Sequence, residues 1–444
     1  MFERPRTGER AVLVRLGLGA PLDPEDLSEF TQLAVSAGAI PVATITGRRE
    51  RPDPRYFVGS GKAEQIRLEA EATGAEVILV DHPLSPGQER NLEKLTGRRV
   101  LDRSGLILDI FAQRARSHEG KLEVELAQLK HIASRLVRGW THLERQRGGG
   151  IGNRGPGETQ LETDRRLLGK RVRVLTERLQ KIKQQRETGR DARAAIPVPS
   201  VALVGYTNAG KSTLFRALSG DTGVYVADQL FATLDPTVRR LRLPGGTQVV
   251  VADTVGFIRD LPHELVAAFQ STLTEAREAT LLLHVIDASD PRRGEHIAEV
   301  DRVLEHIGAG SIPGIRVFNK IDRLEESPRV DRDEAGVVQA VWISAAHDIG
   351  LDLLGTAVAE RLERSVRHVR VQLPLAAGAA RARLYAAGVV QAERQGETAF
   401  DLDVELPDDE LGRLLAVPGA KLVTPDGDTL KSTGTTHRIS SGLR

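Results

Sequence analysis

A short glycine-containing stretch constrains the fold of this chain more than any other part of it. The apolar residues 201–204 run directly into Gly205-x-x-x-x-Gly210-Lys211-Ser212, and a helical pattern follows. In such a loop the glycines let backbone N–H groups surround a phosphate, the lysine supplies a positive charge, and the serine hydroxyl can ligate Mg²⁺. Strand, loop and helix in this order predict a P-loop domain with a doubly wound, mostly parallel sheet.

Two further motifs follow predicted strands, in the order that regulatory GTPases show. The first is Asp253-x-x-Gly256, whose carboxylate can hold a magnesium-bound water and whose glycine N–H can reach a γ-phosphate. The second is Asn319-Lys320-x-Asp322, whose carboxylate can accept hydrogen bonds from guanine N1–H and N2–H₂. Adenine does not offer that pair of donors, so we expect GTP to be preferred over ATP.

The segment between these motifs carries the candidate switch threonine. In "FATLDPT", residues 231–237, both Thr233 and Thr237 have the chemistry to complete a Mg²⁺ shell and sense a γ-phosphate. Many Ras-like GTPases place a glutamine directly after the Asp-x-x-Gly motif, where it orients the attacking water. This chain has Phe257 there, so we predict slow intrinsic hydrolysis, with a partner or another residue positioning the water.

The N-terminal part of the chain is predicted to be a separate α/β domain. Apolar strands near residues 11–16 and 75–81 alternate with helices that begin after Asp23 and Ser85. "GSGK" at 59–62 imitates a phosphate loop but has Tyr56 where the first glycine should stand, so we interpret it as a turn before a helix.

The region from about 104 to 189 is predicted to be helical and strongly basic. Leucines and small apolar residues recur every three or four positions over 122–136 and again over 168–182, which predicts two antiparallel helices of about 20 to 25 residues. Residues 130–190 hold 16 basic and 6 acidic side chains, a net charge of +10, whereas the whole chain has a net charge of +1. This excess favours a nucleic-acid surface over a solvated helix face or a folded-back linker.

The tip of this predicted hairpin is "RGGGIGNRGPGE", residues 147–158. Gly150, Gly152 and Gly155 satisfy G-x-G-x-x-G, but no apolar strand precedes them, so a dinucleotide site is not expected. Pro156 and the "ETQLE" after it indicate the start of the second helix. The arginines of the tip favour contact with RNA phosphates instead.

Composition excludes several classes of protein. The chain has no cysteine, so disulfides, thiolate zinc sites and cysteine nucleophiles are absent, and its eleven histidines are scattered. No signal peptide and no apolar run of about 18 residues is present, so we expect a cytoplasmic protein without an integral membrane segment.

These features resemble the HflX family of GTPases over nearly the whole chain. The matching segments are "LSPGQERNLE", "VLDRSGLILDIFAQRARSHEGKLEVELAQLKH", "HLERQRGGGIGNRGPGETQLETDRR", "GYTNAGKSTLF", "FATLDPT" and "DTVGFIRDLP". The resemblance implies a multidomain α/β protein with an N-terminal α/β domain (1–104), a helical connection, predicted here as a hairpin (105–193, tip 145–158), and a GTPase domain (197–364). The sequence pattern alone predicts a small C-terminal α+β domain (366–444). We expect a β-α-β-β-α order in the last domain, up to about Val417, followed by a mobile tail.

The resemblance also assigns roles to residues, with Thr233 rather than Thr237 as the switch threonine. The implied catalytic residues are Lys211, Thr233 and Gly256. The implied Mg²⁺ ligands are Ser212, Thr233 and, through water, Asp253. The nucleotide-binding residues are Gly205, Tyr206, Thr207, Asn208, Ala209, Gly210, Lys211, Ser212, Thr213, Phe231, Ala232, Thr233, Leu234, Asp235, Asp253, Thr254, Val255, Gly256, Asn319, Lys320, Asp322, Ser344, Ala345 and Ala346, with the Ser344-Ala345 backbone meeting guanine O6. The RNA-binding candidates are Arg145, Arg147, Gly149, Gly150, Arg154, Arg165 and Arg166.

As for function, the resemblance implies a monomeric, Mg²⁺-dependent enzyme that binds GTP and GDP, with ATP hydrolysis as a secondary activity. It implies binding to the large ribosomal subunit and its RNA, and dissociation of stalled or stressed 70S ribosomes, with hydrolysis resetting the factor for release. Two alternatives stay open: a GTPase that acts in ribosome assembly or as an RNA chaperone, and a GTP-dependent switch for a protein or membrane partner.

Overall fold

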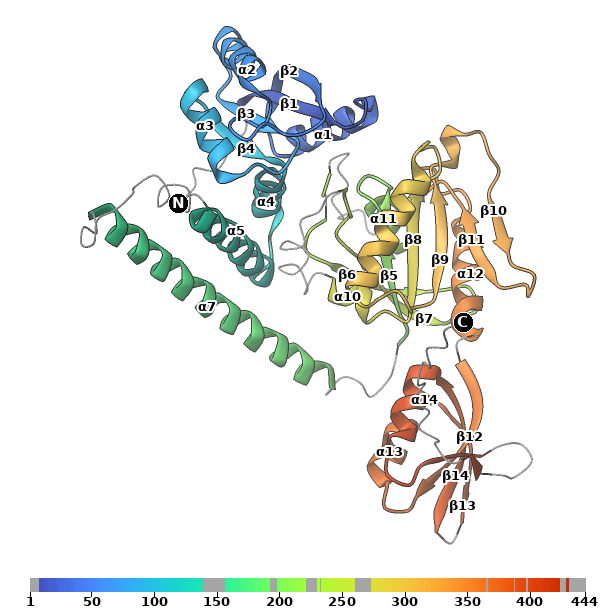
Figure 1. Ribbon diagram of the computed structural model, residues 1–444. Coiled ribbons are helices and arrows are strands. Elements are labelled where there is room, and N and C mark those ends of the chain that lie inside the picture. The colour runs from blue at the N-terminus through green and yellow to red at the C-terminus, as the bar shows by residue number, and fades with distance from the viewer. Residues whose placement is uncertain are drawn as a thin grey trace, which may run out of the picture.

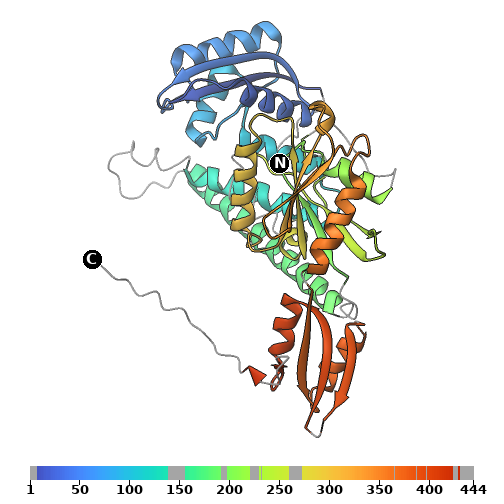
Figure 2. The same cartoon turned by 90° about the vertical axis from the view of Figure 1, so that its right-hand side faces the viewer.

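The computed structural model describes residues 8–138, 156–191, 198–220, 230–231, 233–259, 273–364, 366–386, 388–396, 398–423 and 429–430. Figure 1 shows three sheets and one long helix, and Figure 2 shows from the side that the first and last sheets lie at opposite ends of the molecule. Within the described ranges, no helix is long and apolar enough to cross a membrane.

The N-terminal unit is a four-stranded parallel sheet in the order β2-β1-β3-β4. Its helices begin where the sequence predicts: the Asp23 carboxylate caps α1, and Ser85 forms a capping box with Gln88 at α3. Gly59, at φ 88°, precedes α2, but Ser60, Gly61 and Lys62 form the first turn of that helix, so the turn expected at "GSGK" is limited to Gly59. The elements are β1 (Arg10–Leu18), α1 (Pro24–Ser36), β2 (Ile40–Arg49), α2 (Ser60–Thr73), β3 (Val77–Val80), α3 (Pro86–Thr96), β4 (Arg99–Asp102) and α4 (Arg103–Arg114).

The helical region contains α5 (His118–Arg138) and α7 (Pro156–Asp191), which pack side by side (Figure 1). Their seam is the predicted one, with α5 and α7 running antiparallel. It consists of Leu122, Leu126, Leu129, Val172, Leu175, Leu179 and Ile182. The expected length was wrong for α7, which has 36 residues and spans about 54 Å. Of the tip expected at 145–158, residues 145–155 lie outside the described residues, and residues 156–158 belong to the first turn of α7.

The central unit is a seven-stranded sheet in the order β10-β11-β9-β8-β5-β7-β6. The five inner strands are parallel, and β6 and β10 are antiparallel edges. Its elements are β5 (Ser200–Val204), α8 (Lys211–Ser219), β6 (Thr237–Arg242), β7 (Gln248–Asp253), α10 (Thr274–Arg277), β8 (Leu281–Asp287), α11 (Arg293–His306), β9 (Gly314–Asn319), a 3₁₀ turn (Ile321–Arg323), β10 (Arg329–Arg332), β11 (Val338–Trp342) and α12 (Leu351–Arg364).

The two faces of this sheet are covered differently. Leucine and phenylalanine side chains of α8 and α12 pack on one face. On the other face, α10 and α11 share a single buried core with α1 and α4 of the N-terminal unit. The N-terminal unit therefore packs directly against the central unit, beside the carboxyl ends of its parallel strands.

The C-terminal unit is an antiparallel sheet in the order β13-β14-β12-β15-β16, with two helices on one face. The β-α-β-β-α order expected up to Val417 is present, and two short strands that we did not anticipate follow it. The elements are β12 (Val366–Pro374), α13 (Gly378–Ala386), β13 (Val390–Gln395), β14 (Ala399–Pro407), α14 (Asp408–Leu415), β15 (Lys421–Val423) and β16 (Thr429–Leu430).

Candidate active site

The P-loop joins the central strand β5 to α8, and its glycines stand where no side chain fits. Gly205 has φ 149°, and a Cβ there would lie 2.2 Å from the carbonyl oxygen of Val285. Gly210 has φ 93°, and a Cβ there would lie 2.3 Å from the Asn319 side-chain nitrogen. Larger residues would push the loop off the sheet, so both glycines are required by close approach as well as by backbone angle.

Lys211 is the first residue of α8, and its buried side chain reaches back into this loop. Its ammonium donates to the carbonyl oxygens of Gly205, at 3.0 Å, and Tyr206, at 2.7 Å. Burial lowers the pKa of Lys211 to about 8, although the charge of Asp253 acts in the opposite direction. The loop thus holds one desolvated positive charge where a phosphate would sit.

Three side-chain oxygens converge beside Lys211. The Ser212 hydroxyl lies 2.9 Å from the Thr233 hydroxyl, and each lies 2.8 Å from Asp253 Oδ2. Burial raises the pKa of Asp253, and its other oxygen is buried without a hydrogen-bond partner in the described part of the chain. Thr237 instead starts β6 and pairs with Asp253 along the sheet.

The loop after Asp253 turns back onto the P-loop. A Cβ on Gly256 would lie 2.9 Å from Lys211 Nζ, so this glycine permits the close approach. The Phe257 N–H donates to the Gly205 carbonyl at 3.1 Å, and the Phe257 carbonyl accepts from the Thr207 N–H at 2.7 Å. The Phe257 side chain is 1% exposed, inside the core, so it neither lines the site nor contacts a solvent molecule there.

The side chains expected to recognise a base lie at the ends of β9 and β11. Asn319 donates to the Ala209 carbonyl at 3.0 Å and accepts from the Ala345 N–H at 2.9 Å. Asp322 accepts from the Ser344 hydroxyl at 2.5 Å. The structure therefore brings these residues together. The Ala345 N–H, which we expected to meet a ligand, donates instead to the Asn319 side chain.

Lys320 closes this side of the P-loop. Its ammonium donates to the Asn208 carbonyl at 2.7 Å and lies 2.8 Å from a carboxylate oxygen of Asp287. The 3₁₀ turn that follows buries Ile321 and places Asp322 next to it. The chain after β9 is therefore held by the polar contacts of Lys320 and by the burial of Ile321.

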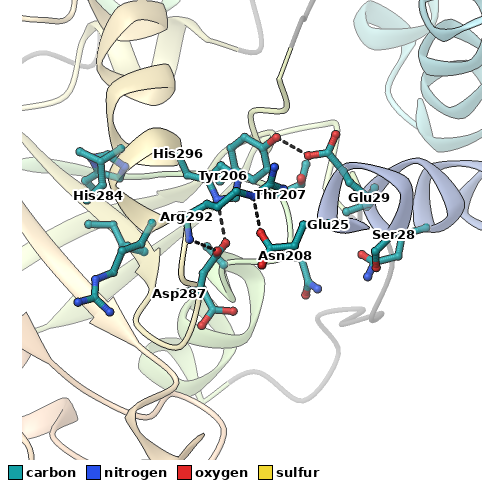
Figure 3. A pocket seen from close by; sticks show the side chains of 17 residues that line it. Glu25, Ser28, Glu29, Tyr206, Thr207, Asn208, His284, Asp287, Arg292 and His296 are labelled. Carbon is teal, nitrogen blue, oxygen red and sulfur yellow. Dashed lines mark hydrogen bonds and ion pairs between the residues drawn. The ribbon is translucent and has the colours of Figure 1, made fainter. Parts of the chain in front are cut away.

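A cavity of about 210 Å³ lies between α1, the P-loop and the start of α11 (Figure 3). Glu25 and Glu29 line it from α1, and Arg292 from the approach to α11. The Tyr206 ring stacks on His296 at 3.8 Å between ring centroids. Sequence reasoning missed this contribution of α1, because acidic residues near the start of a helix are ordinary and carry no signal of a distant partner.

Several candidate residues cannot be placed. Ala232 and the RNA candidates Arg145, Arg147, Gly149, Gly150 and Arg154 lie outside the described residues. Arg165 and Arg166 lie on α7 and are exposed.

The central parallel sheet, the P-loop after β5 and the motifs at the ends of β7, β9 and β11 define the chain as a P-loop GTPase. Family comparisons agree in three consecutive regions: residues 24–112 match "GTP-binding GTPase N-terminal", 114–193 match "GTP-binding GTPase Middle Region", and 200–320 match "50S ribosome-binding GTPase". The chain belongs to the HflX family of GTPases. It is 56% identical over 92% of its length to GTPase HflX of Escherichia coli strain K12, of which the match covers 96%.

Two further proteins are similar to this chain. GTPase HflX of Caldanaerobacter subterraneus is 46% identical over 84% of this chain and 85% of its own. Among solved structures, a GTP-binding protein from Sulfolobus solfataricus in complex with GDP is 23% identical with a TM-score of 0.44, covering 80% of this chain and 99% of that one.

Proposed function

We propose that this GTPase binds the large ribosomal subunit in its GTP state and dissociates stalled or stressed 70S ribosomes, and that hydrolysis resets it for release. The observation that carries the proposal is the match of residues 200–320 to a family of 50S ribosome-binding GTPases, within a chain 56% identical to a GTPase HflX. The exposed Arg165 and Arg166 on α7 add a basic surface, outside the GTPase domain, that suits RNA phosphates.

In the proposed nucleotide site, the P-loop holds the phosphates. Lys211 exchanges its two carbonyl contacts for phosphate oxygens, and the Gly256 N–H faces the γ-phosphate. Asp322 accepts from the guanine ring on the side away from its contact with Ser344. In this account the residues of the predicted nucleotide-binding set act as one surface along the carboxyl edge of the sheet.

The oxygens of Ser212, Thr233 and Asp253 fit a Mg²⁺ ion. Two hydroxyl oxygens lie against one buried carboxylate oxygen, which gives three hard oxygen donors in one place. When bound, the ion neutralises charge on the phosphates. The protein's part is to hold these donors in place, and Asp253 keeps one buried oxygen available for this purpose.

Phe257 supports a ribosome-dependent reaction. Its side chain is turned into the core and its backbone is bonded to the P-loop, so nothing at this position orients a water. We propose that contact with the ribosome supplies or aligns the missing group.

Cosedimentation tests the proposal. In GTPγS the protein is expected to sediment with 50S subunits, and in GTP it is expected to reduce the 70S peak. A double variant, Arg165→Glu with Arg166→Glu, should weaken binding and lower its salt dependence, whereas Arg302→Glu, on an exposed residue of α11, should leave both unchanged. Absence of 50S binding in GTPγS would refute the proposal, and accumulation of incomplete subunits in a deletion strain would favour the assembly function instead.

A further inference from the structure

The segments that surround the P-loop are held by the N-terminal unit and by the start of α5. We call residues 230–231 and 233–237 the switch I segment, and residues 253–259 the switch II segment. Each makes polar contacts with a part of the chain more than 100 residues away. The residues that make the contacts described below lie outside the nucleotide-binding set discussed above, except for Tyr206, Phe231 and Asp235.

The first contact clamps the switch II segment at Arg259. Its N–H donates to the Tyr206 hydroxyl at 2.9 Å, and its carbonyl accepts from Arg103 at 3.1 Å. The Tyr206 hydroxyl in turn donates to Glu29 at 2.5 Å (Figure 3), and Arg103 donates to the same carboxylate at 2.6 Å. The Arg259 guanidinium pairs with Asp26 of α1. Both backbone polar groups and the side chain of one residue are thus held at once.

Burial makes this arrangement rigid. Tyr206 is 8% exposed, and burial together with the Glu29 charge raises the pKa of Tyr206 above its ordinary value, so the hydroxyl keeps its proton and donates a hydrogen bond to Glu29. Arg103 is 3% exposed and also donates to Asp81 at 2.6 Å, which fixes its guanidinium in the N-terminal unit. Removing one partner from a buried charge pair such as Arg103 with Glu29 is costly, so the clamp responds to displacement of its partners.

The second contact holds the switch I segment at Asp235. Its carboxylate accepts from the N–H of Arg116 at 2.7 Å, from the N–H of Ser117 at 2.8 Å and from the Ser117 hydroxyl at 2.5 Å. These groups lie immediately before α5, and Gly120 in the first turn leaves room for the carboxylate. A Cβ on Gly120 would lie 2.4 Å from Asp235 Oδ1.

One hydrogen bond and one contact between aromatic rings extend the second contact. The Leu230 N–H donates to the Ser36 hydroxyl at 3.0 Å, and the Phe231 ring packs edge-on against Phe111 at 4.7 Å between centroids. The switch I segment is therefore held by α1, α4 and the start of α5 together.

In the structure that shows both contacts, Thr233 of the switch I segment and Gly256 of the switch II segment lie against the P-loop side chains. Thr233 lies two residues before Asp235 and is hydrogen-bonded to Ser212 and Asp253. Gly256 lies three residues before Arg259 and is packed on Lys211. Residues so close in sequence cannot move independently, so whatever stabilises Thr233 and Gly256 in place also stabilises the docking of Asp235 and Arg259.

We propose that the N-terminal unit and the start of α5 act as a built-in effector surface that binds the two switch segments in their triphosphate arrangement. GTP strengthens this docking and GDP weakens it, so the nucleotide controls how firmly the N-terminal unit and the α5–α7 hairpin are attached to the GTPase domain. By reciprocity, the docking strengthens GTP binding by the same factor. The inference rests on the proposed nucleotide site.

Gly120→Ala tests this inference in the full-length protein. The added methyl group displaces the Asp235 carboxylate from the start of α5, while alanine favours the helix more than glycine does. GTPγS affinity should fall at least about fivefold, and GDP affinity should change less than about twofold, in line with ordinary coupling between sites. Gly61→Ala, in the first turn of α2 with open space around it, is the matched control and should change neither affinity.

Hydrogen exchange at α1 and at the start of α5 gives an independent readout. In the wild type these amides should exchange more slowly in GTPγS than in GDP, and Gly120→Ala should remove the difference. Ser117→Ala, which removes one donor to Asp235 without adding bulk, should reduce the difference if Gly120→Ala fails to fold.

The outcomes separate the two levels of the account. If the wild type bound neither nucleotide, the proposed nucleotide site would be wrong. If it bound both, but exchange did not depend on the nucleotide and the variants kept the GTPγS affinity of the wild type, the effector surface would be overturned while the site stood.

Discussion

Asp322→Asn probes the proposed role of Asp322 in base recognition, in the 3₁₀ turn that follows β9. One oxygen of this carboxylate accepts from Ser344 at 2.5 Å, and the other is 3.8 Å from His347, so one side of the group is open to a ligand. Guanine would donate two hydrogen bonds to that charge, each worth about 1.5 to 3 kcal/mol. Because the side chain is 25% exposed, we take the lower end, a loss of about 3 kcal/mol, or about 150-fold in GTP affinity.

The assay is competition binding against a fluorescent GDP, with GTP, ATP and xanthosine triphosphate as competitors. The asparagine variant should lose GTP affinity and gain affinity for xanthosine triphosphate, since the amide can donate to the extra oxygen of xanthine. Ser344→Ala, which removes the neighbouring hydrogen bond but keeps the carboxylate, should cost only about 1 kcal/mol. Unchanged GTP affinity in Asp322→Asn would refute the assignment, and so would an equal loss of affinity for GTP and for xanthosine triphosphate.

Three more predictions follow from buried side chains. Without ribosomes, GTP turnover should stay below about 0.01 s⁻¹, and Phe257→Gln should lower the melting temperature without raising turnover, since position 257 is buried; turnover of several per second would contradict this. Leu175→Ala removes a fully buried side chain from the α5–α7 seam and should lower the free energy of unfolding of the hairpin by about 2 to 5 kcal/mol. Urea unfolding monitored by hydrogen exchange measures this loss, and a loss under about 1 kcal/mol would argue against the seam. Burial lowers the pKa of His284 to about 4, so the unfolded chain takes up this proton first as pH falls. His284 should therefore cost nothing above about pH 6.5 and up to about 3 kcal/mol by pH 4, and His284→Gln should flatten the stability profile over that range.

Local signals in the sequence predicted much of this fold because their physical causes are local. The helix starts after Asp23 and Ser85 are side-chain caps, and the α7 start at Pro156 follows from the fixed φ of proline. The α5–α7 seam follows from a repeat of three and four residues, which only a helix turns to one side.

The misses have physical causes too. β2 is an edge strand whose residues are mostly half-exposed, so its sequence lacks the apolar run that reveals β3 or β8. β15 and β16 have three and two residues, too few to show a period. The length of α7 was underestimated because its seam residues occupy only part of the helix.

The candidate site divides in the same way. The P-loop and the motifs ending in Gly256 and Asp322 could be located because short spacing carries their chemistry. The contacts of Glu29 with Tyr206 and of Asp235 with Ser117 join residues 177 and 118 positions apart. No periodicity or spacing links such pairs, so only the three-dimensional structure reveals that the N-terminal unit reaches the switch segments.

The most direct test of the central claim is GTP turnover by the purified protein with and without 50S subunits. The account predicts slow turnover alone and stimulation by at least about 10³-fold when 50S subunits saturate, since a partner that completes a GTPase site contributes about 10³ to 10⁵. It also predicts that the Arg165→Glu, Arg166→Glu variant raises the 50S concentration needed for stimulation while leaving basal turnover unchanged. Equal turnover with and without 50S subunits would contradict the account.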